Sequence, residues 1–257
     1  MTDSRIAPVE DNLLAFFAAA GGAAVLRRDA DDDVTAIRSD VPFPLFNVVS
    51  GARFGAEAAT RAGELADSYV AAGLPWMWWL TPSTTSIAIE DVLEARGLAR
   101  GDVPGMYCDL EGTPAGRELP GVSLSARPDD SAFIDVMLGG FGIPELFREP
   151  LTVVMEQFPD VINVLASLDG RPVACGTAYL TGATAGLYNI ATLEEARGRG
   201  IGYALTVELM ARSRSAGATH AVLHASESGR AVYERAGFAE VCAVPQYVWA
   251  PPGIDAT

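Results

Sequence analysis

Lysine is absent from this chain, so arginine supplies all 18 basic residues, against 33 acidic ones. The resulting net charge of −15 argues against a general nucleic-acid-binding protein, because phosphate backbones are bound by clustered positive charge. An acidic surface suits cationic ligands, but it is also common in proteins that only need solubility. We therefore expect no nucleic-acid partner, and the charge by itself identifies no ligand.

Cysteine and histidine are scarce. The three cysteines are widely spaced, no Cys-x-x-Cys pair occurs, and the only histidines are His220 and His224. We therefore expect neither a disulfide framework nor a metal site. No Gly-x-Ser-x-Gly motif is present either, which argues against one common kind of covalent catalysis.

The sequence also lacks a hydrophobic run that could cross a membrane. Residues 13–26 form the longest apolar stretch near the start, but Gly21 and Gly22 interrupt it. Arg5 is the only basic residue before this stretch and no clean cleavage site follows it, so no signal peptide is predicted. We expect a cytoplasmic protein with no membrane partner.

An alternation of strand and helix patterns dominates the C-terminal half. Apolar periodicity and turn signals are the basis of the assignment. We expect strands at residues 122–126, 161–168, 172–180, 185–192, 218–225 and 241–249, helices at 130–141, 145–158, 202–216 and 229–235, and a loose tail at 251–257. This order predicts an α/β fold.

The N-terminal half repeats these landmarks in weaker form. Residues 45–50 resemble residues 187–192, and residues 93–98 resemble residues 233–238. Between these landmarks, an Ala-Gly pair precedes a strand pattern in both halves. Three landmarks in one order indicate two copies of one unit.

The two copies are separated by a segment rich in Gly and Pro at residues 112–121, which predicts a linker. We therefore expect domains at residues 1–113 and 121–251. Trp76 and Trp78 fall on one side of a strand expected at residues 76–81. Either they pack in a core or they line a ligand pocket, and the sequence leaves both interpretations open.

A glycine- and arginine-rich loop precedes the helix expected at residues 202–216. Its sequence is Arg197-Gly198-Arg199-Gly200-Ile201-Gly202. Glycines allow a close backbone approach to a ligand, and a helix start presents free N–H groups to an anion. A Walker A loop requires lysine, and the dinucleotide pattern Gly-x-Gly-x-x-Gly fails at Tyr203 and Leu205. The loop therefore favours a pyrophosphate site of another kind.

The loop resembles the R/Q-x-x-G-x-G/A signature of the GNAT superfamily of acyl-CoA N-acyltransferases. Residues 232–238, which read Val-Tyr-Glu-Arg-Ala-Gly-Phe, are similar to a second signature of that family. The resemblance covers roughly residues 121–250, and the N-terminal half resembles a decayed copy without the loop. It implies two tandem GNAT-like units, each a mixed, mostly antiparallel sheet flanked by helices.

The resemblance also implies the chemistry. GNAT enzymes transfer the acetyl group of acetyl-CoA directly to an amine, here a small-molecule or peptide acceptor, without a metal. The implied cofactor-binding residues are the loop, the central strand and a serine where the family often has asparagine: Ile190, Ala191, Thr192, Arg197, Gly198, Arg199, Gly200, Ile201, Gly202 and Ser226.

Two residues are candidates for proton transfer. Tyr233 stands at the position of the family's general acid, and a phenol is protonated at neutral pH. His224 is a candidate general base because its ordinary pKa lies near neutrality, although a lone histidine on a strand is more often packed. Glu194, Glu195 and a bound water are alternatives.

Two other functions stay open at this point. A non-catalytic acyl-CoA-binding or regulatory protein would need the loop but no proton donor for the thiolate. An acyltransferase that uses a longer acyl-CoA would share all of these residues. The sequence also leaves the acceptor and the oligomeric state open.

Overall fold

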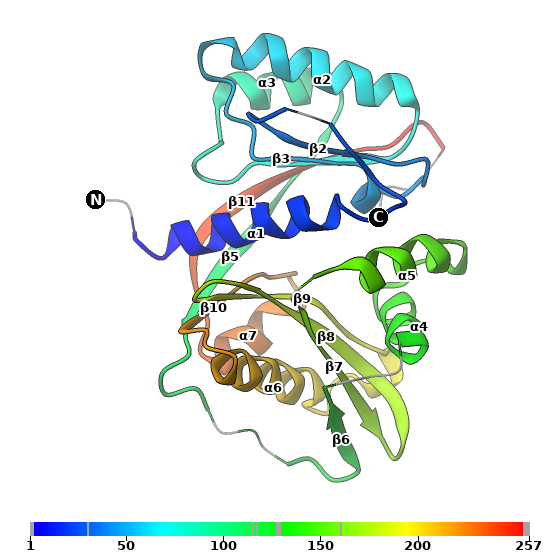
Figure 1. The fold of residues 1–257 in the computed structure, drawn as a ribbon, viewed down its shortest axis with the longest axis vertical. Helices are drawn as coiled ribbons and strands as arrows, with labels where there is room; N and C mark the ends of the chain where they lie inside the picture. The colour runs from blue at the N-terminus through cyan, green and yellow to red at the C-terminus, as the bar shows by residue number, and fades with distance from the viewer. Residues whose placement is uncertain are drawn as a thin grey trace. The chain divides into compact units, whose positions relative to one another are not determined.

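The computed structural model describes residues 3–29, 31–114, 116, 118–126, 130–159 and 161–253. The chain forms two compact units, which are interleaved in the sequence (Figure 1). The first unit contains Met1–Leu13 and Pro104–Val241, and the second contains Leu14–Val103 and Cys242–Thr257.

The first unit is built on a mixed sheet with the strand order β5-β10-β9-β8-β7-β6. Only β9 and β10 pair in parallel, whereas the neighbouring pairs on either side of them are antiparallel. The elements are β5 (Ala99–Asp109), β6 (Val122–Ser125), α4 (Asp130–Phe141), η3 (Glu145–Phe147), α5 (Arg148–Gln157), β7 (Val161–Leu168), β8 (Arg171–Thr181), β9 (Thr184–Thr192), η4 (Glu194–Ala196), α6 (Ile201–Ser215), β10 (His220–His224) and α7 (Arg230–Ala236).

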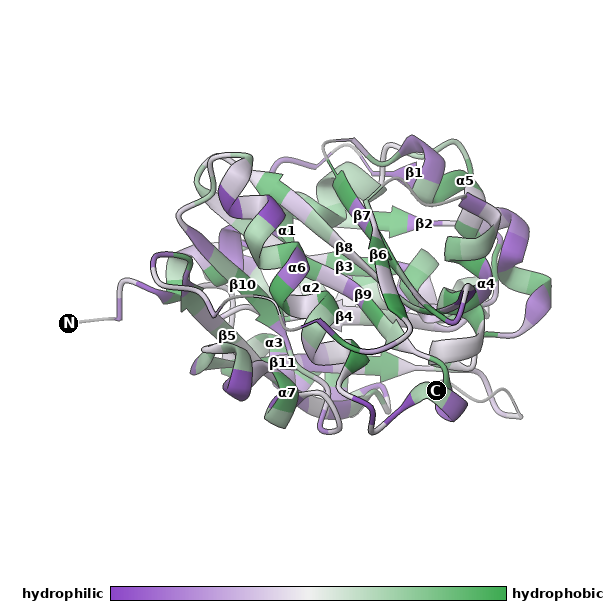
Figure 2. Cartoon of the chain, turned by 90° about the horizontal axis from the view of Figure 1, so that it is seen from below, coloured by the Kyte–Doolittle hydropathy of each residue, from purple (hydrophilic) through white to green (hydrophobic). Residues whose placement is uncertain are grey.

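Helices α4 and α6 cover opposite faces of this sheet (Figure 1). Successive residues of a strand point to opposite faces. Accordingly, Val164 and Ala174 belong to the core cluster under α6, whereas Leu165 and Cys175 belong to the cluster under α4. Hydrophilic residues are prominent on α5, whereas the strands are mostly hydrophobic or neutral (Figure 2). Both faces of the central strands are thus buried, as their apolar sequences require.

The second unit has a smaller sheet with the order β1-β2-β3-β4-β11, in which β3 and β4 are parallel. Its elements are α1 (Ile6–Ala20), β1 (Arg27–Arg28), β2 (Thr35–Arg38), η1 (Pro44–Phe46), β3 (Val48–Ser50), η2 (Gly55–Glu57), α2 (Ala58–Ala72), β4 (Trp76–Trp79), α3 (Ile87–Ala95) and β11 (Ala239–Trp249). Strands β5 and β11 each run from one unit into the other, and α1 does the same near its middle.

Trp76 and Trp78 are fully buried in the core of the second unit. Trp76 stacks on Tyr69 of α2 with ring centroids 4.9 Å apart, and Trp78 meets Phe54 edge to face at 6.4 Å. Such contacts stabilise a core beyond the area that they bury. The pair therefore serves packing inside this unit, and no side chain of the pair is left exposed to line a pocket.

The repeat indicated by the sequence is visible as a repeated order of elements. Strand, helix, parallel strand, helix and strand follow one another as β3-α2-β4-α3-β5 and again as β9-α6-β10-α7-β11. The first helix of each repeat, α2 and α6 respectively, is 15 residues long. The fold class is therefore confirmed: two tandem units with mixed, mostly antiparallel sheets and flanking helices.

The compact units do not follow the order of the repeat along the chain. The last strand of each half is paired within the other unit, because β5 pairs with β10 and β11 pairs with β4. The division at residues 1–113 and 121–251 describes the repeats in sequence and remains a prediction. Residues 112–121, expected to be a linker, contain no helix or strand where they are described.

Most predicted elements agree with the structure to within one or two residues, and two deviations have clear causes. The helix expected at 145–158 is divided into η3 and α5, with Pro150 in the first turn of α5, where a missing N–H is tolerated. The strand expected at 172–180 begins one residue earlier, because Arg171 pairs with Leu168 after a register irregularity that follows Ala166. Only residues 251–253 of the expected tail are described.

None of the helices, within the described ranges, combines the length and the apolar composition that a membrane span requires.

Candidate active site

The pairing of strands β9 and β10 ends part of the way along β9, inside the first unit. Their parallel pairing runs from His220↔Thr184 to Leu223↔Leu187. Beyond that point β9 continues to Thr192, while β10 stays paired with β5 up to His224↔Gly105. We call the place where the pairing of β9 with β10 ends the wedge. Ile190, Ala191 and Thr192, expected to hold the cofactor, all lie on its β9 side.

A β-bulge distorts β9 where the wedge opens. Cys175 pairs with Ala191 and Thr177 with Tyr188, so one residue of β8 faces two of β9. Asn189, inside the bulge, has a φ of 54°, a left-handed conformation that non-glycine residues rarely adopt. A bulge re-aims backbone groups out of the ladder. In the sequence Asn189 stands out only as part of the repeated segment at residues 187–192.

The glycine loop forms the closed end of the site between η4 and α6. Gly198 and Gly200 have φ values of 74° and 80°, which explains why these positions need glycine. Helix α6 begins at Ile201 directly after Gly200, and no side chain caps its first turn. The first N–H groups of α6 are therefore available to an anion. A Cβ on Gly202 would lie 3.5 Å from Thr192 Oγ1, so the first turn packs against the end of β9.

The two arginines of the loop have different surroundings. Arg197 donates from Nε to the Thr192 carbonyl at 3.1 Å and from Nη2 to the Gly140 carbonyl at 3.1 Å. It thereby joins the loop, β9 and α4. Arg199 is exposed, and among the described residues it has no hydrogen bond or ion pair. Of the two, Arg199 is the cation with no protein acceptor in the described part of the chain.

Helix α4 approaches β9 closely through two glycines that were not among the residues expected from the sequence. A Cβ on Gly140 would lie 2.7 Å from Ala191 Cβ, and one on Gly139 would lie 2.8 Å from Leu193 Cδ2. A side chain on Gly140 would therefore collide with the strand itself, whereas one on Gly139 would require the Leu193 side chain to move. The Gly-Gly pair inside a helix pattern was the available signal, because glycine lowers helix propensity and needs another reason to be there.

Tyr233 and Ser226 meet around Gly229 at the end of the site nearer to β10. A Cβ on Gly229 would lie 2.8 Å from Tyr233 Cε2 and 3.1 Å from Ser226 Oγ. The Ser226 hydroxyl accepts a hydrogen bond from the Gly229 N–H at 3.2 Å. Tyr233 is 9% exposed, and burial raises its pKa to about 12. The phenol is therefore protonated at neutral pH.

His224 closes β10 at the point where its pairing with β9 has already ended. The side chain is half-buried, and loss of solvation lowers its pKa to about 4. Its imidazole is therefore neutral at pH 7, and it is a weaker proton acceptor than a general base with a pKa near neutrality. Glu194 and Glu195, the alternatives, are exposed in η4.

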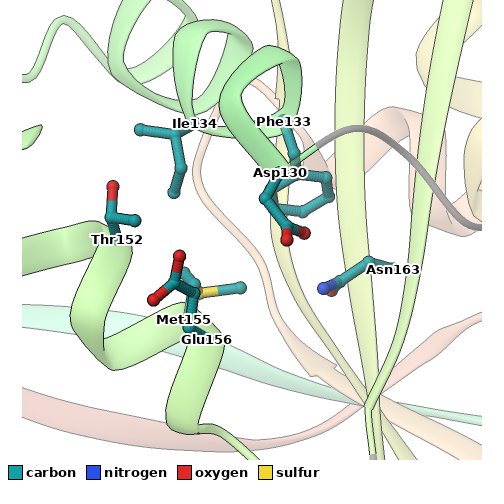
Figure 3. A pocket seen from close by; sticks show the side chains of 7 residues that line it. All are labelled: Asp130, Phe133, Ile134, Thr152, Met155, Glu156 and Asn163. Carbon is teal, nitrogen blue, oxygen red and sulfur yellow. The ribbon is translucent and has the colours of Figure 1, made fainter.

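A small cavity lies beneath α4 and α5, on the face of the sheet that carries Asn189. Its volume is about 10 Å³, roughly the space of one water molecule. Side chains from both helices and from β7 converge on it (Figure 3): Asp130, Phe133, Ile134, Thr152, Met155, Glu156 and Asn163. Met155 and Asn163 connect this cavity to the bulge, as described below.

The structure thus brings together the residues expected from the sequence. The loop, the end of β9, Ser226, Tyr233 and His224 all belong to the first unit and lie at the adjacent ends of β9, β10, α6 and α7. What the sequence did not indicate are the bulge at Asn189, the close approach of α4 and the bracing role of Arg197.

Comparisons with known proteins agree with this geometry. The model of the acetyltransferase (GNAT) family matches residues 135–238, which include α6, β10 and α7. No curated protein matches the chain in sequence.

Several solved structures share the fold over nearly the whole chain. A GCN5-related N-acetyltransferase from Kribbella flavida superposes with a TM-score of 0.73 at 16% identity, covering 97% of this chain and 96% of its own. One from Sphaerobacter thermophilus gives 0.64 at 17% identity, covering 96% and 93%. A tandem GNAT protein from the clavulanic acid biosynthesis pathway gives 0.59 at 14% identity, covering 98% and 97%.

At these identities the structural neighbours establish the fold, and the sequence match establishes the family of the segment that carries the site. Residues 135–238 are thus similar to the acetyltransferase (GNAT) family, and the chain as a whole shares the fold of GCN5-related N-acetyltransferases.

Proposed function

We propose that this protein transfers the acetyl group of acetyl-CoA to the primary amine of a small-molecule or peptide acceptor. The observation that carries the proposal is the wedge between β9 and β10, which ends at an uncapped, glycine-rich helix start inside the GNAT domain. In this proposal the first unit is the catalytic one, and the N-terminal repeat is a degenerate copy.

The residues of the loop fit a pyrophosphate. The first turn of α6 offers backbone N–H groups, Gly198 and Gly200 leave room for close approach, and Arg199 adds an uncompensated positive charge. Arg197 holds the loop against Thr192 and Gly140. Backbone groups of Ile190, Ala191 and Thr192, together with Ser226, would hold the pantetheine arm along the wedge.

Acetyl-CoA supplies the activated acetyl group, and the protein supplies orientation, polarisation and proton transfer. Backbone N–H groups at the bulge would polarise the thioester carbonyl. Tyr233, protonated because of its raised pKa, would give its proton to the departing thiolate. The amine proton would pass to His224 or to water. The low pKa of His224 favours water, and Glu194 and Glu195 are exposed in η4.

A screen of amine acceptors with acetyl-CoA, read as free thiol released, tests the reaction. Release that depends on both the amine and the protein supports N-acetyl transfer. Binding of acetyl-CoA without release across a broad amine panel would favour the non-catalytic alternative. Faster release from longer thioesters would identify a different acyl donor.

Calorimetry with CoA tests the loop. Gly200→Glu places a carboxylate where the pyrophosphate is proposed, so affinity should fall by about 100-fold or more. Gly182→Glu is the matched control, because Gly182 also has a positive φ of 58° and a Cβ there would have nothing within 4 Å. Gly182 lies in the turn between β8 and β9, at the other end of β9. Equal affinity for both variants would contradict the site.

A further inference from the structure

Three polar side chains form a row across the sheet beneath α5. Thr177 of β8 donates from Oγ1 to Asn163 Oδ1 of β7 at 2.8 Å, and it accepts from Asn189 Nδ2 of β9 at 3.4 Å. Asn163 and Thr177 are direct partners in the ladder. A hydroxyl has one proton to give and two lone pairs, so this arrangement fixes the orientation of both amides. We call these three residues the bracket.

The Asn189 side chain of the bracket is contacted from both β8 and α5. Thr177 is 1% exposed, so its hydroxyl competes little with solvent. Met155 of α5 places its sulfur 3.7 Å from Asn189 Nδ2. Met155 and Asn163 also line the cavity of Figure 3, which shows the Asn163 amide between β7 and the two helices. Asn189 is therefore fixed by contacts from β8 and from α5.

The backbone of Asn189 is unusual for its place in the fold. Among the described residues only Asp169 and Asn189 have a positive φ without being glycine. Asp169 lies in the hairpin turn between β7 and β8, where such a conformation is ordinary. Asn189 lies inside a strand. A strained backbone in a strand persists only where the surroundings enforce it, and such strain concentrates at functional sites.

The turned backbone changes the direction of the groups that follow. The Asn189 carbonyl accepts a hydrogen bond from Cys175 Sγ at 3.5 Å, so it points toward a side chain of β8 on the α4 face. Because C=O and N–H of one trans peptide point in opposite directions, the N–H of Ile190 points away from Cys175. Where this N–H points is therefore decided by the conformation of Asn189.

We propose that Asn189 is a positioning residue for acyl transfer and that the bracket with Thr177 and Asn163 acts through it. The bracket keeps the bulge of β9 in its left-handed conformation and so fixes the direction of the Ile190 N–H, which points away from Cys175. This inference rests on the proposed function, because it concerns the orientation of the thioester carbonyl. The bracket itself touches neither cofactor nor acceptor.

Kinetics of matched variants test the bracket. Asn189→Gly still permits a positive φ but removes the amide, and Thr177→Val removes the hydroxyl at nearly constant volume. Each should lower kcat by about 10–100-fold through misorientation of the carbonyl, with the KM for acetyl-CoA changed less than about threefold. Thr177→Ser, which keeps the hydroxyl, should retain most of the wild-type kcat. Thr152→Val removes a hydroxyl that bonds only within α5 and should have no effect.

A double variant separates the bracket from general destabilisation. Because both residues act through one bulge, Asn189→Gly combined with Thr177→Val should lower kcat hardly further than either change alone. Independent losses of stability would add instead. Multiplying effects, or single variants with kcat within about twofold of the wild type, would overturn the proposal.

Infrared difference spectra of bound acetyl-CoA, labelled with ¹³C at the carbonyl, give a readout that needs no acceptor. A polarised thioester carbonyl absorbs at lower frequency, so the band should shift down on binding to the wild type and return toward its free position in Asn189→Gly and Thr177→Val. An identical band in wild type and variants would refute the bracket. Absence of turnover in the amine screen, with the shift present, would refute the proposed function alone.

Discussion

Tyr233 combines two properties that a proton donor to a thiolate requires. Burial raises its pKa to about 12, and its ring packs against the turn that follows β10. A Cβ on Gly229 would lie 2.8 Å from Tyr233 Cε2, so the ring packs directly on the backbone of this turn. Its place is therefore decided by packing, and its protonation state by the low polarity of that packing.

Tyr233→Phe keeps the ring and removes only the donor. Turnover should fall by about 10²–10⁴, the range for a positioned general acid, while affinity for acetyl-CoA should change little. In the wild type, ionisation of Tyr233 should cause no loss of activity below about pH 10, since the group titrates near 12. Steady-state kinetics across pH provide the measurement.

Tyr107→Phe is the control for that experiment. Burial also raises the pKa of Tyr107 to about 12, but its hydroxyl bonds Asp109 at 2.7 Å and its ring stacks on His220, at the end of β10 away from the wedge. Its loss should leave turnover unchanged. Undiminished turnover in Tyr233→Phe would show that this tyrosine is only a packed aromatic.

His224 makes stability depend on pH in a definite direction. Its pKa is about 4 in the folded protein, below the ordinary 6.5, because burial disfavours the cation. The unfolded chain therefore takes up a proton near pH 6.5 and the folded chain only near 4. The stabilisation is complete above about pH 6.5 and is lost as the pH falls toward about 4.

His224→Gln should remove this dependence. Between pH 7 and pH 5 the wild type should lose about 1–2 kcal/mol of unfolding free energy through His224, and the variant should not. Urea unfolding at both values measures the difference. His220→Gln serves as the comparison, with a smaller effect, because the lowering of the His220 pKa by burial is opposed by the Asp109 carboxylate. A wild-type-to-variant difference independent of pH would contradict the assignment.

At the scale of elements, the site depends on how closely α4 lies on β9. Gly139 and Gly140 bring the helix backbone against Ala191 and Leu193, and Arg197 ties the Gly140 carbonyl to the loop. The end of β9, the start of α6 and the end of α4 are thus connected by direct contacts. A displacement of any one of these three segments should therefore change the geometry at the wedge.

Gly140→Ala tests this coupling. Alanine normally favours a helix over glycine by up to about 1 kcal/mol, yet here its Cβ would lie 2.7 Å from Ala191 Cβ and 3.4 Å from the Thr192 nitrogen. The end of α4 must therefore move, and kcat/KM for acetyl-CoA should fall about tenfold or more. Gly101→Ala, with nothing within 4 Å, should retain full activity. Equal activities would show that α4 can shift without disturbing β9.

At the scale of the whole molecule, the two repeats differ at the corresponding place. In the first unit β9 continues beyond Leu187, the last residue that pairs with β10. In the second unit β3 stays paired with β4 up to the last residue of β3, Ser50, which pairs with Trp79. Phe54, just after β3, packs edge to face on Trp78. The second unit therefore has no wedge between its parallel strands, in addition to lacking the loop sequence.

We expect one CoA per chain. Calorimetry with the wild type should give a stoichiometry of one, and Gly200→Glu should abolish the binding isotherm in the range where the wild type saturates. The variant reports on the second unit alone, since any CoA binding there would be unaffected by a change in the loop of the first unit. Saturable binding to Gly200→Glu within the concentration range where the wild type saturates would contradict the prediction.

The sequence by itself determined the order of elements, the repeat and the loop of the first unit. These features are local: glycine spacing, a run of alternating apolar residues or a helix start can be identified within about ten neighbouring residues. The loop from Arg197 to Gly202 was found in this way, whereas Ile190, Ala191, Thr192, Ser226 and Tyr233 were implied by the resemblance to the GNAT family. Helix α4 and strand β7 were predicted with the bounds that the structure shows.

Only the tertiary structure decided which strands pair, and with that the composition of the units. The exchange of β5 and β11 depends on contacts between residues far apart in the sequence, such as Val222 and Tyr107, and no local pattern encodes them. The same holds for Arg197, whose guanidinium could have faced a ligand but bonds two carbonyls brought to it by β9 and α4. The lowered pKa of His224 likewise follows from burial, which only packing across the sheet creates.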